Sequence, residues 1–248
     1  MSDKKTMAHL LADFDPKRPD NLLMDIFSKQ AAFASKWCDF DNRKNYAQYR
    51  HWVDTFSWCI MDELSEVLGW LPWKHWKDYT DYRVEHIEVR FELIDILHFV
   101  VNLCLLSDTT AEDLRNHCKA RGTDLRSLML ATKADFIYNT GEDLPVLTDD
   151  ILYEYTKVYL GKINRIVSTF HNPAVLHAYR GRTDEKSDIH AFKTNVVKPG
   201  TTKILLHLLV LFQLWNMNEY YVWLYYAAKN KENHARQERG YKEMEEIF

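Results

Sequence analysis

The 248-residue sequence contains few of the residues that interrupt helices. It has only seven glycines and six prolines, which argues against a turn-rich fold such as an all-β sandwich or barrel. Its longest strongly apolar stretch, Ile204 to Trp215, is far shorter than the roughly 20 residues of a membrane-spanning helix. We therefore expect no membrane segment and no membrane partner.

Cysteine and net charge are also scarce. The four cysteines form no C-x-x-C pair, and three of them lie inside apolar runs, so buried free thiols are expected rather than a disulfide framework. The formal charge of −4 gives no general attraction to nucleic acid polymers. Residues 1–15 lack an apolar core long enough for a signal peptide, so we expect a cytoplasmic protein.

Apolar residues recur at intervals of three and four along almost the whole chain, which predicts an all-α protein. The stretch 172–200 combines Pro173, Gly181, Pro199 and Gly200 with many charges and is expected to form a long, partly irregular loop. Helices are predicted near residues 20–37, 46–70, 84–107, 110–121, 124–139, 148–169, 202–215 and 218–238.

Two pairs of acids stand out against this apolar background. Glu63 and Glu66 are three residues apart, as are Glu92 and Asp95, so each pair projects from one face of its helix. Like charges on an apolar face repel unless a cation neutralises them. Four carboxylates from two antiparallel helices form an oxygen cage that suits Mg²⁺ bridging substrate phosphates. The spacing favours a magnesium site and phosphoryl chemistry.

Other interpretations of these acids remain open at this point. In a chain with 27% charged residues, an E-x-x-E or E-x-x-D pair is usually a solvated helix face. A di-iron bundle requires two E-x-x-H motifs and two further glutamates, and only Asp95 with His98 approximates one such motif. Among metals, Mg²⁺ is therefore the ion that we expect.

A polar segment near the C-terminus has the composition of a phosphate clamp. Lys229, Asn233 and Arg236 share a helix face at i, i+4 and i+7, and Gly240 permits a turn that brings Tyr241 alongside. This arrangement presents two cations and an amide to a triphosphate. The alternative is a solvated helix end whose cations complement the helix dipole.

Candidate residues for base recognition occur in three places. Trp73 and Trp76 lie in the break between the acid-bearing helices, where an indole can stack on a base and Lys77 can contact a phosphate. Tryptophans in loops are, however, more often hydrophobic anchors. Gln30 and Asn102 carry amides that can pair with the edge of a pyrimidine.

Taken in order, these motifs resemble the dimeric all-α dUTPase family, within the helical nucleoside triphosphate pyrophosphatase superfamily. The similarity is greatest to the dCTPase/dUTPase group of T-even-type bacteriophages. It covers about residues 22–107 and 217–242. The motifs are Glu63-x-x-Glu66, W-K-x-W-K from Trp73, FELIDILHFVVN from Phe91, and LYYAAKNKENHARQERGY from Leu224.

The resemblance implies roles for individual residues. The implied Mg²⁺ ligands, and with them the catalytic acids, are Glu63, Glu66, Glu92 and Asp95. Glu66 is expected to orient the attacking water. The implied phosphate contacts are Lys229, Asn233, Arg236 and Tyr241, with Lys77 assisting. The implied base pocket contains Gln30, Trp73 or Trp76, His98 and Asn102.

Two features depart from the family pattern. Gln30 is followed by Ala31-Ala32-Phe33-Ala34-Ser35, where relatives commonly have an asparagine, and this bears on base specificity. About 100 residues, Asp108 to roughly Leu206, occur where compact phage relatives have almost none. We therefore expect a catalytic core in residues 1–107 and 207–248, with an inserted helical segment or subdomain in residues 108–206.

The expected activity is Mg²⁺-dependent hydrolysis of dUTP to dUMP and pyrophosphate, with dCTP and the diphosphates as further substrates. A homodimer in the cytoplasm, or in the host cytoplasm for a phage protein, would thereby control the deoxypyrimidine nucleotide pool. The enzymatic alternatives are a pyrophosphatase that prefers dCTP or a modified pyrimidine triphosphate, and a broad MazG-like pyrophosphatase. The other alternative is a non-catalytic helical binding module.

Overall fold

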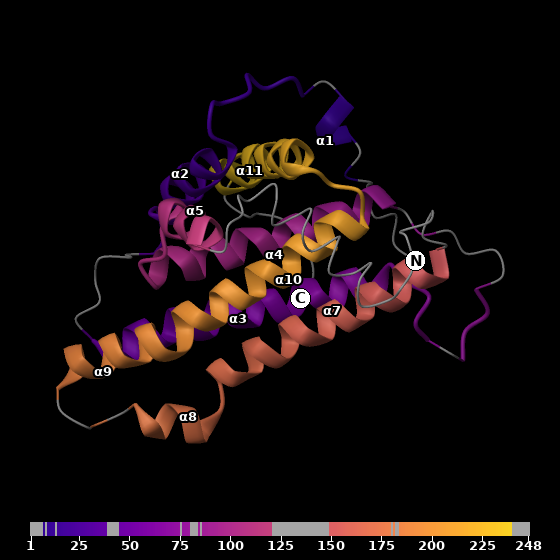
Figure 1. Cartoon of the computed structure of the whole chain (residues 1–248). Coiled ribbons are helices and arrows are strands. Elements are labelled where there is room, and N and C mark those ends of the chain that lie inside the picture. Colours follow the sequence, from indigo (N-terminus) through magenta and orange to yellow (C-terminus); the bar gives the residue numbers. More distant parts are fainter. Residues whose placement is uncertain are drawn as a thin grey trace.

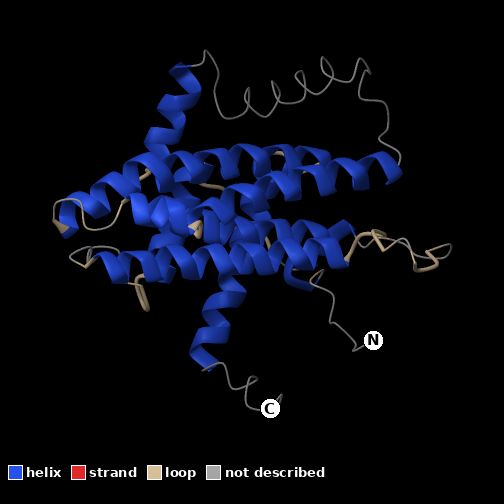
Figure 2. Cartoon of the chain, turned by 90° about the horizontal axis from the view of Figure 1, so that it is seen from below, coloured by secondary structure: helices blue, strands red, loops and turns tan. Residues whose placement is uncertain are grey.

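The computed structural model describes residues 7, 9–12, 14–38, 45–74, 76–79, 84, 86–120, 149–179, 181 and 184–239. This part of the chain contains helices and no strand (Figure 2), which confirms the all-α fold class. The helices are α1 (His9–Ala12), α2 (Leu22–Ala34), α3 (Tyr46–Gly69), α4 (His86–Leu106), α5 (Ala111–Ala120), α7 (Asp149–Phe170), α8 (Pro173–Ala178), α9 (Glu185–Phe192), the π-helical turn η1 (Lys193–Val197), α10 (Lys198–Leu214) and α11 (Glu219–Arg239).

Four long helices, α3, α4, α7 and α10, form the main bundle. α4 packs against α3 and α10, and α7 packs against the same two helices, so the four lie side by side (Figure 1). A second layer consists of α2 and α11, which pack on each other and on α4. α4 therefore has other bundle helices on one side and the second layer on the other, and is enclosed between them.

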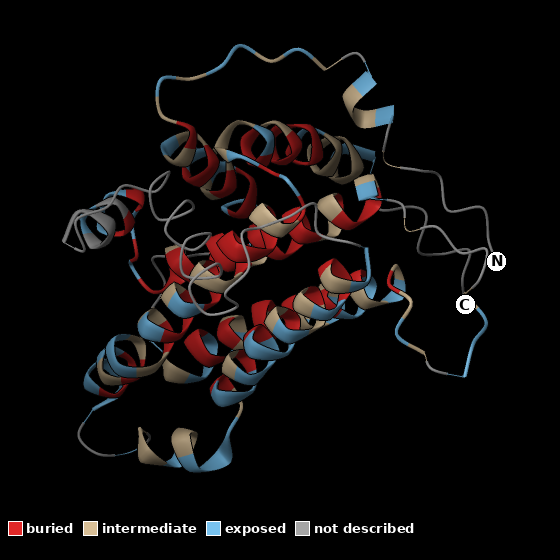
Figure 3. Ribbon diagram, turned by 45° about the vertical axis from the view of Figure 1, so that its right-hand side comes forward, coloured by how far each residue is buried: buried red, intermediate tan, exposed pale blue. Residues whose placement is uncertain are grey.

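The burial of α4 follows from its sequence. Fifteen of its 21 residues are buried, and Figure 3 shows buried positions gathered along the centre of the fold. A helix that is apolar around its whole circumference is expected in the interior rather than at the surface. Its polar residues Asp95, His98 and Asn102 are therefore withdrawn from water and require partners.

Most predicted helices occur with ends within three residues of the predicted positions. Local caps explain two of the starts: the Asn21 side chain accepts a hydrogen bond from the Met24 amide, and Asn45 accepts one from the Ala47 amide. The helix predicted near 202–215 begins earlier, at Lys198. The helix predicted near 124–139 lies outside the described residues.

The stretch 172–200 corrects the sequence prediction. A long, partly irregular loop was expected there, but this expectation was wrong, because α8, α9, η1 and the start of α10 occupy most of it. Asn172 caps α8 with Pro173 in its first turn, and Asp184 caps α9 by accepting a hydrogen bond from the Ser187 amide. Polar residues and proline therefore act here as helix starts rather than helix breaks.

Pro199 and Gly200 also lie inside a helical run. Pro199 has no amide hydrogen and lies in the first turn of α10, directly after η1. At the end of η1, the Lys198 amide donates to the Lys193 carbonyl, five residues earlier. Gly200 allows close packing, since a Cβ there would lie 2.5 Å from the Phe170 ring. α10 therefore approaches the end of α7 more closely than any larger residue would permit.

Two further expectations can be compared with the described residues. Cys38, Cys59 and Cys104 carry free thiols, as the sequence predicts. None of the described helices combines the length and apolar character needed to cross a bilayer. α7 and α10, from the predicted insertion, pack against α3 and α4, and the division at residues 107 and 206 stays a prediction.

Candidate active site

Three of the four predicted acids converge between α3 and α4. Glu63 comes from α3, and Glu92 and Asp95 come from successive turns of α4; one carboxylate oxygen from each lies within 4.8 Å of the other two. We call these three residues the acid cluster. Glu66 is exposed one turn further along α3. Its charge still acts on the cluster, because it contributes to the raised pKa of both Glu63 and Glu92.

The acid cluster concentrates negative charge where water is partly excluded. Burial, then the charges of Asp95, Glu92 and Glu66, raise the pKa of Glu63 to about 9. Burial raises the pKa of Glu92 to about 7, and it also raises the pKa of Asp95. Near neutral pH the metal-free cluster therefore retains protons, and a cation that displaces them would remove the repulsion.

Two donors orient the carboxylates of α4. Trp70 Nε1 donates to Glu92 Oε1 at 3.1 Å, and Lys229 Nζ of α11 lies 2.5 Å from Asp95 Oδ2. Lys229 is only 5% exposed, so its ammonium is a buried counter-ion of the cluster. Three convergent carboxylates with this excess of negative charge fit a hard, oxygen-preferring dication such as Mg²⁺.

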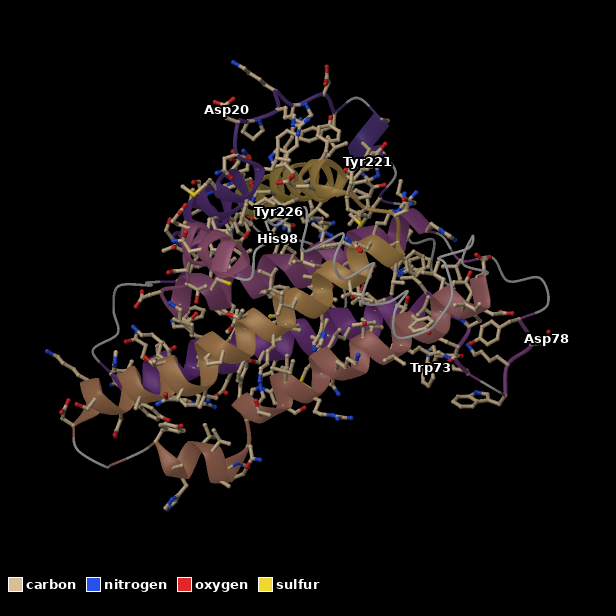
Figure 4. All side chains as sticks on the ribbon, in the orientation of Figure 1. Asp20, Trp73, Asp78, His98, Tyr221 and Tyr226 are labelled. Carbon is tan, nitrogen blue, oxygen red and sulfur yellow. The ribbon has the colours of Figure 1, made fainter. Side chains whose placement is uncertain are left out.

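A neutral polar network begins one turn further along α4. Gln30 Nε2 from α2 donates to Asn102 Oδ1 at 2.7 Å, and the Tyr226 hydroxyl from α11 donates to Gln30 Oε1 at 2.7 Å. The His98 ring stacks on Tyr226 with centroids 4.3 Å apart and an 18° interplanar angle. Figure 4 shows these two rings together beneath α11. We call these four buried residues the amide network.

Three buried polar atoms around this network lack a hydrogen-bond partner among the described residues: His98 Nε2, Asn102 Nδ2 and Asn230 Nδ2. His98 Nδ1 lies 2.9 Å from the Ile94 carbonyl and must donate to it, because a carbonyl oxygen only accepts. Burial lowers the pKa of His98 to about 3. The neutral ring therefore presents Nε2 as an acceptor, while the two amide nitrogens are donors. Because buried polar groups are normally hydrogen-bonded, these three atoms are candidates to contact a bound ligand.

The predicted phosphate residues on α11 extend from the acid cluster toward the end of the helix. Lys229 contacts Asp95, and Asn233, one turn later, is half-buried. Arg236 pairs with a glutamate on the preceding turn, at 3.2 Å, and its charge opposes part of the rise that burial causes in the pKa of Asp95. Tyr241 lies outside the described residues. The phosphate roles stay predictions.

The predicted residues Trp73, Trp76 and Lys77 lie on the loop between α3 and α4, and all three are exposed. The two indoles pack edge to face with ring centroids 6.0 Å apart. Figure 4 places Trp73 at one end of the molecule, away from His98 and Tyr226. The base-stacking and phosphate roles of these three residues stay predictions.

Trp70, Tyr226 and Asn230 were not among the predicted site residues. Trp70 shares a helical phase with the α3 acids, which hinted at its position but not at its bond to Glu92. Tyr226 and Asn230 are four residues apart on a helix and therefore share a face, and this spacing was the available signal. The residues around them in the C-terminal motif are mostly charged, and a charged segment predicts phosphate contacts rather than buried amides.

A comparison with known families agrees with this geometry. A family model described as dUTPase matches residues 23–241, which is most of the chain and includes every predicted site residue. The chain belongs to the dUTPase family. No curated protein matches the sequence. Membership of the dUTPase family gives the protein a nucleotide as its substrate and pyrophosphatase chemistry as its role.

Proposed function

We propose that this dUTPase-family protein hydrolyses dUTP to dUMP and pyrophosphate with the help of Mg²⁺. The observation that supports this most strongly is the arrangement along α4. An acid cluster fit for a dication lies one turn from buried side chains whose donor and acceptor atoms are not hydrogen-bonded among the described residues. The same helix therefore presents a reaction centre and a recognition site at a separation suited to one nucleotide.

The acid cluster supplies the metal ligands in this proposal. Glu63, Glu92 and Asp95 would hold Mg²⁺, with Glu66 on the adjoining turn as the remaining predicted ligand. When bound, the ion lowers the pKa of a water and neutralises charge on the departing pyrophosphate. The hydrogen bond from Trp70 keeps the Glu92 carboxylate in position for it.

In the reaction, the water oxygen forms a bond to the α-phosphorus, and the bond from that phosphorus to the oxygen bridging the β-phosphate breaks. Glu66, exposed beside the cluster, orients the water and accepts its proton. The pyrophosphate leaves with the bridging oxygen. One water is consumed, and one dUMP and one pyrophosphate are formed.

Lys229 has two successive partners in this proposal. In the metal-free chain its ammonium neutralises Asp95. Because Asp95 would also hold the dication, its charge would no longer need the ammonium, and Lys229 would be able to contact the phosphates together with Asn233, Arg236 and Tyr241. The clamp then acts on charge that develops on the leaving group.

The unpaired buried atoms account for a pyrimidine base. The Watson–Crick edge of uracil presents acceptor, donor and acceptor, and therefore requires a donor, an acceptor and a donor from the protein. His98 Nε2 supplies the acceptor, and Asn102 Nδ2 and Asn230 Nδ2 supply the donors. Cytosine requires the same set in a different order, which makes dCTP the second candidate substrate.

The test is a pyrophosphate-release screen over dUTP, dCTP, dTTP and dATP, with and without Mg²⁺. We expect release from dUTP, weaker release from dCTP, little from dATP, and none in EDTA. A Glu63→Ala variant that still released pyrophosphate from dUTP at the wild-type rate would refute the proposal. Measuring the molar mass during the screen tests the predicted homodimer at the same time.

A further inference from the structure

The amide network has a direction that the hydroxyl of Tyr226 imposes. This hydroxyl donates to Gln30 Oε1, which turns Gln30 Nε2 toward Asn102 Oδ1. The other polar atom of the Asn102 amide, Nδ2, must then point away from Gln30, where it has no hydrogen-bond partner among the described residues. Exchanging the nitrogen and oxygen of both amides would reverse every bond and present Asn102 Oδ1 instead.

The reversed network is disfavoured because Tyr226 has one hydroxyl proton to place. Tyr226 is fully buried, and its hydroxyl donates to Gln30 Oε1. In the reversed arrangement Gln30 would donate to Tyr226, and the buried hydroxyl proton would lose its acceptor. An unsatisfied buried donor is costly, so the tyrosine selects the observed direction.

We propose that Tyr226 is a specificity-determining positioning residue, which acts through Gln30 to make Asn102 a hydrogen-bond donor toward the base. This inference rests on the proposed function and adds a choice between pyrimidines to it. Tyr226 itself need not touch the base edge. Its ring stacks on His98. Its hydroxyl controls, through two successive hydrogen bonds, which atom of the Asn102 amide faces away from Gln30.

The choice between bases follows from their different edges. Uracil has a carbonyl oxygen at position 4 and a hydrogen at N3, whereas cytosine has an amino group at position 4 and a bare N3. In the pose that we propose, Asn102 Nδ2 faces position 4 and His98 Nε2 faces N3, so that uracil would form two hydrogen bonds. Cytosine meets a donor with a donor and an acceptor with an acceptor. The observed polarity thus selects dUTP over dCTP.

The experiment compares kcat/KM for dUTP and dCTP in the wild type and in Tyr226→Phe. Without the hydroxyl, the bias toward one direction is lost, and the dUTP-to-dCTP ratio should fall about five- to tenfold, the worth of one neutral hydrogen bond. Tyr225→Phe is the matched control, because Tyr225 is also buried but packs against Phe91. Its ratio should stay at the wild-type value.

A double-mutant cycle separates this role from a merely structural one. Gln30→Met cuts the connection and should also lower the ratio, and adding Tyr226→Phe to it should change the ratio no further. If Tyr226→Phe fails to fold, Gln30→Met alone decides the matter. Equal losses on both substrates, with an unchanged ratio, would overturn the inference while leaving the proposed function intact. If the wild type hydrolyses neither substrate, the proposed function fails, and binding of dUMP against dCMP then tests the network.

Discussion

The acid cluster and the amide network lie one turn apart on α4 and are built in opposite ways. The acid cluster brings like charges together, so that burial and repulsion raise the pKa of Glu63 to about 9. The amide network is neutral, and its hydrogen bonds connect Tyr226, Gln30 and Asn102 without a ligand. Unfavourable repulsion between buried carboxylates is thus found where a metal is expected, and preorganised hydrogen bonds are found where a base is expected.

Replacing Glu63 with glutamine would make the acid cluster more like the neutral network, and this has the largest expected effect. Loss of a charged ligand should lower kcat/KM for pyrophosphate release by on the order of 10²–10³-fold. Above about pH 9, where Glu63 is ionised, removing this buried like charge should also raise the melting temperature of the metal-free protein. The control is Glu154→Gln, an exposed carboxylate on α7 that should change neither quantity. Retained activity would contradict the assignment.

Lys229→Met tests whether the buried ammonium both neutralises Asp95 and contacts the phosphates of the substrate. Charged hydrogen bonds contribute about 1.5–3 kcal/mol, so kcat/KM should fall about 10- to 100-fold, largely through KM. Asp95 loses its partner as well, so the metal-free protein should melt at a lower temperature. Lys231→Met, an exposed neighbour on α11, is the control. An unchanged KM would mean that Lys229 serves Asp95 alone.

Trp70→Phe sharpens the comparison by removing the hydrogen bond that Trp70 donates to Glu92. A donor that orients a ligand typically contributes 10–100-fold to metal affinity, and for this single neutral bond we expect about tenfold weaker Mn²⁺ binding by calorimetry. Trp58→Phe is the matched control, since Trp58 is on the same helix and 59% exposed. Equal Mn²⁺ affinity in all three proteins would show that Glu92 is held by packing alone.

The pH dependence of stability distinguishes the two regions with the smallest effect. Glu63 keeps its proton to about pH 9 when folded but only to its ordinary pKa of 4.5 when unfolded. Between these values the folded chain binds more protons, so metal-free stability falls as pH rises. The melting temperature should drop from pH 7 to 9, by about 2–4 °C for each kcal/mol of stability lost, and saturating Mg²⁺ should reduce the drop.

Above about pH 7 the amide network should contribute nothing to that slope, because His98 is then neutral in the folded chain and, with its ordinary pKa of 6.5, in the unfolded chain as well. The pKa of His98 is lowered to about 3 by burial, and the pKa of Tyr226 is raised above its ordinary value of 10. Gln30→Met should therefore leave the slope as it is in the wild type, whereas Glu63→Gln should flatten it. A slope that persists in Glu63→Gln would assign the titration to other groups.

Sequence reasoning found much of the acid cluster, because helix periodicity alone places Glu92 and Asp95 on one face. It also selected Gln30, His98 and Asn102, but only as separate members of a family pocket. Lys229 was predicted to bind phosphate, and nothing local indicated its contact with Asp95. The loop expected at 172–200 was wrong because proline and asparagine both break helices and start them, and the flanking packing determines which occurs.

The sequence by itself determined most of the helices, the faces on which the acids lie and the membership of the dUTPase family. These depend on a 3.6-residue period and on motif order, which are properties of neighbouring residues. Only the tertiary structure decided that Gln30 meets Asn102 across 72 residues and Tyr226 across 196. Contacts between layers depend on how whole helices pack. The direction of the hydrogen bonds in the amide network depends on where the hydroxyl proton of Tyr226 is donated.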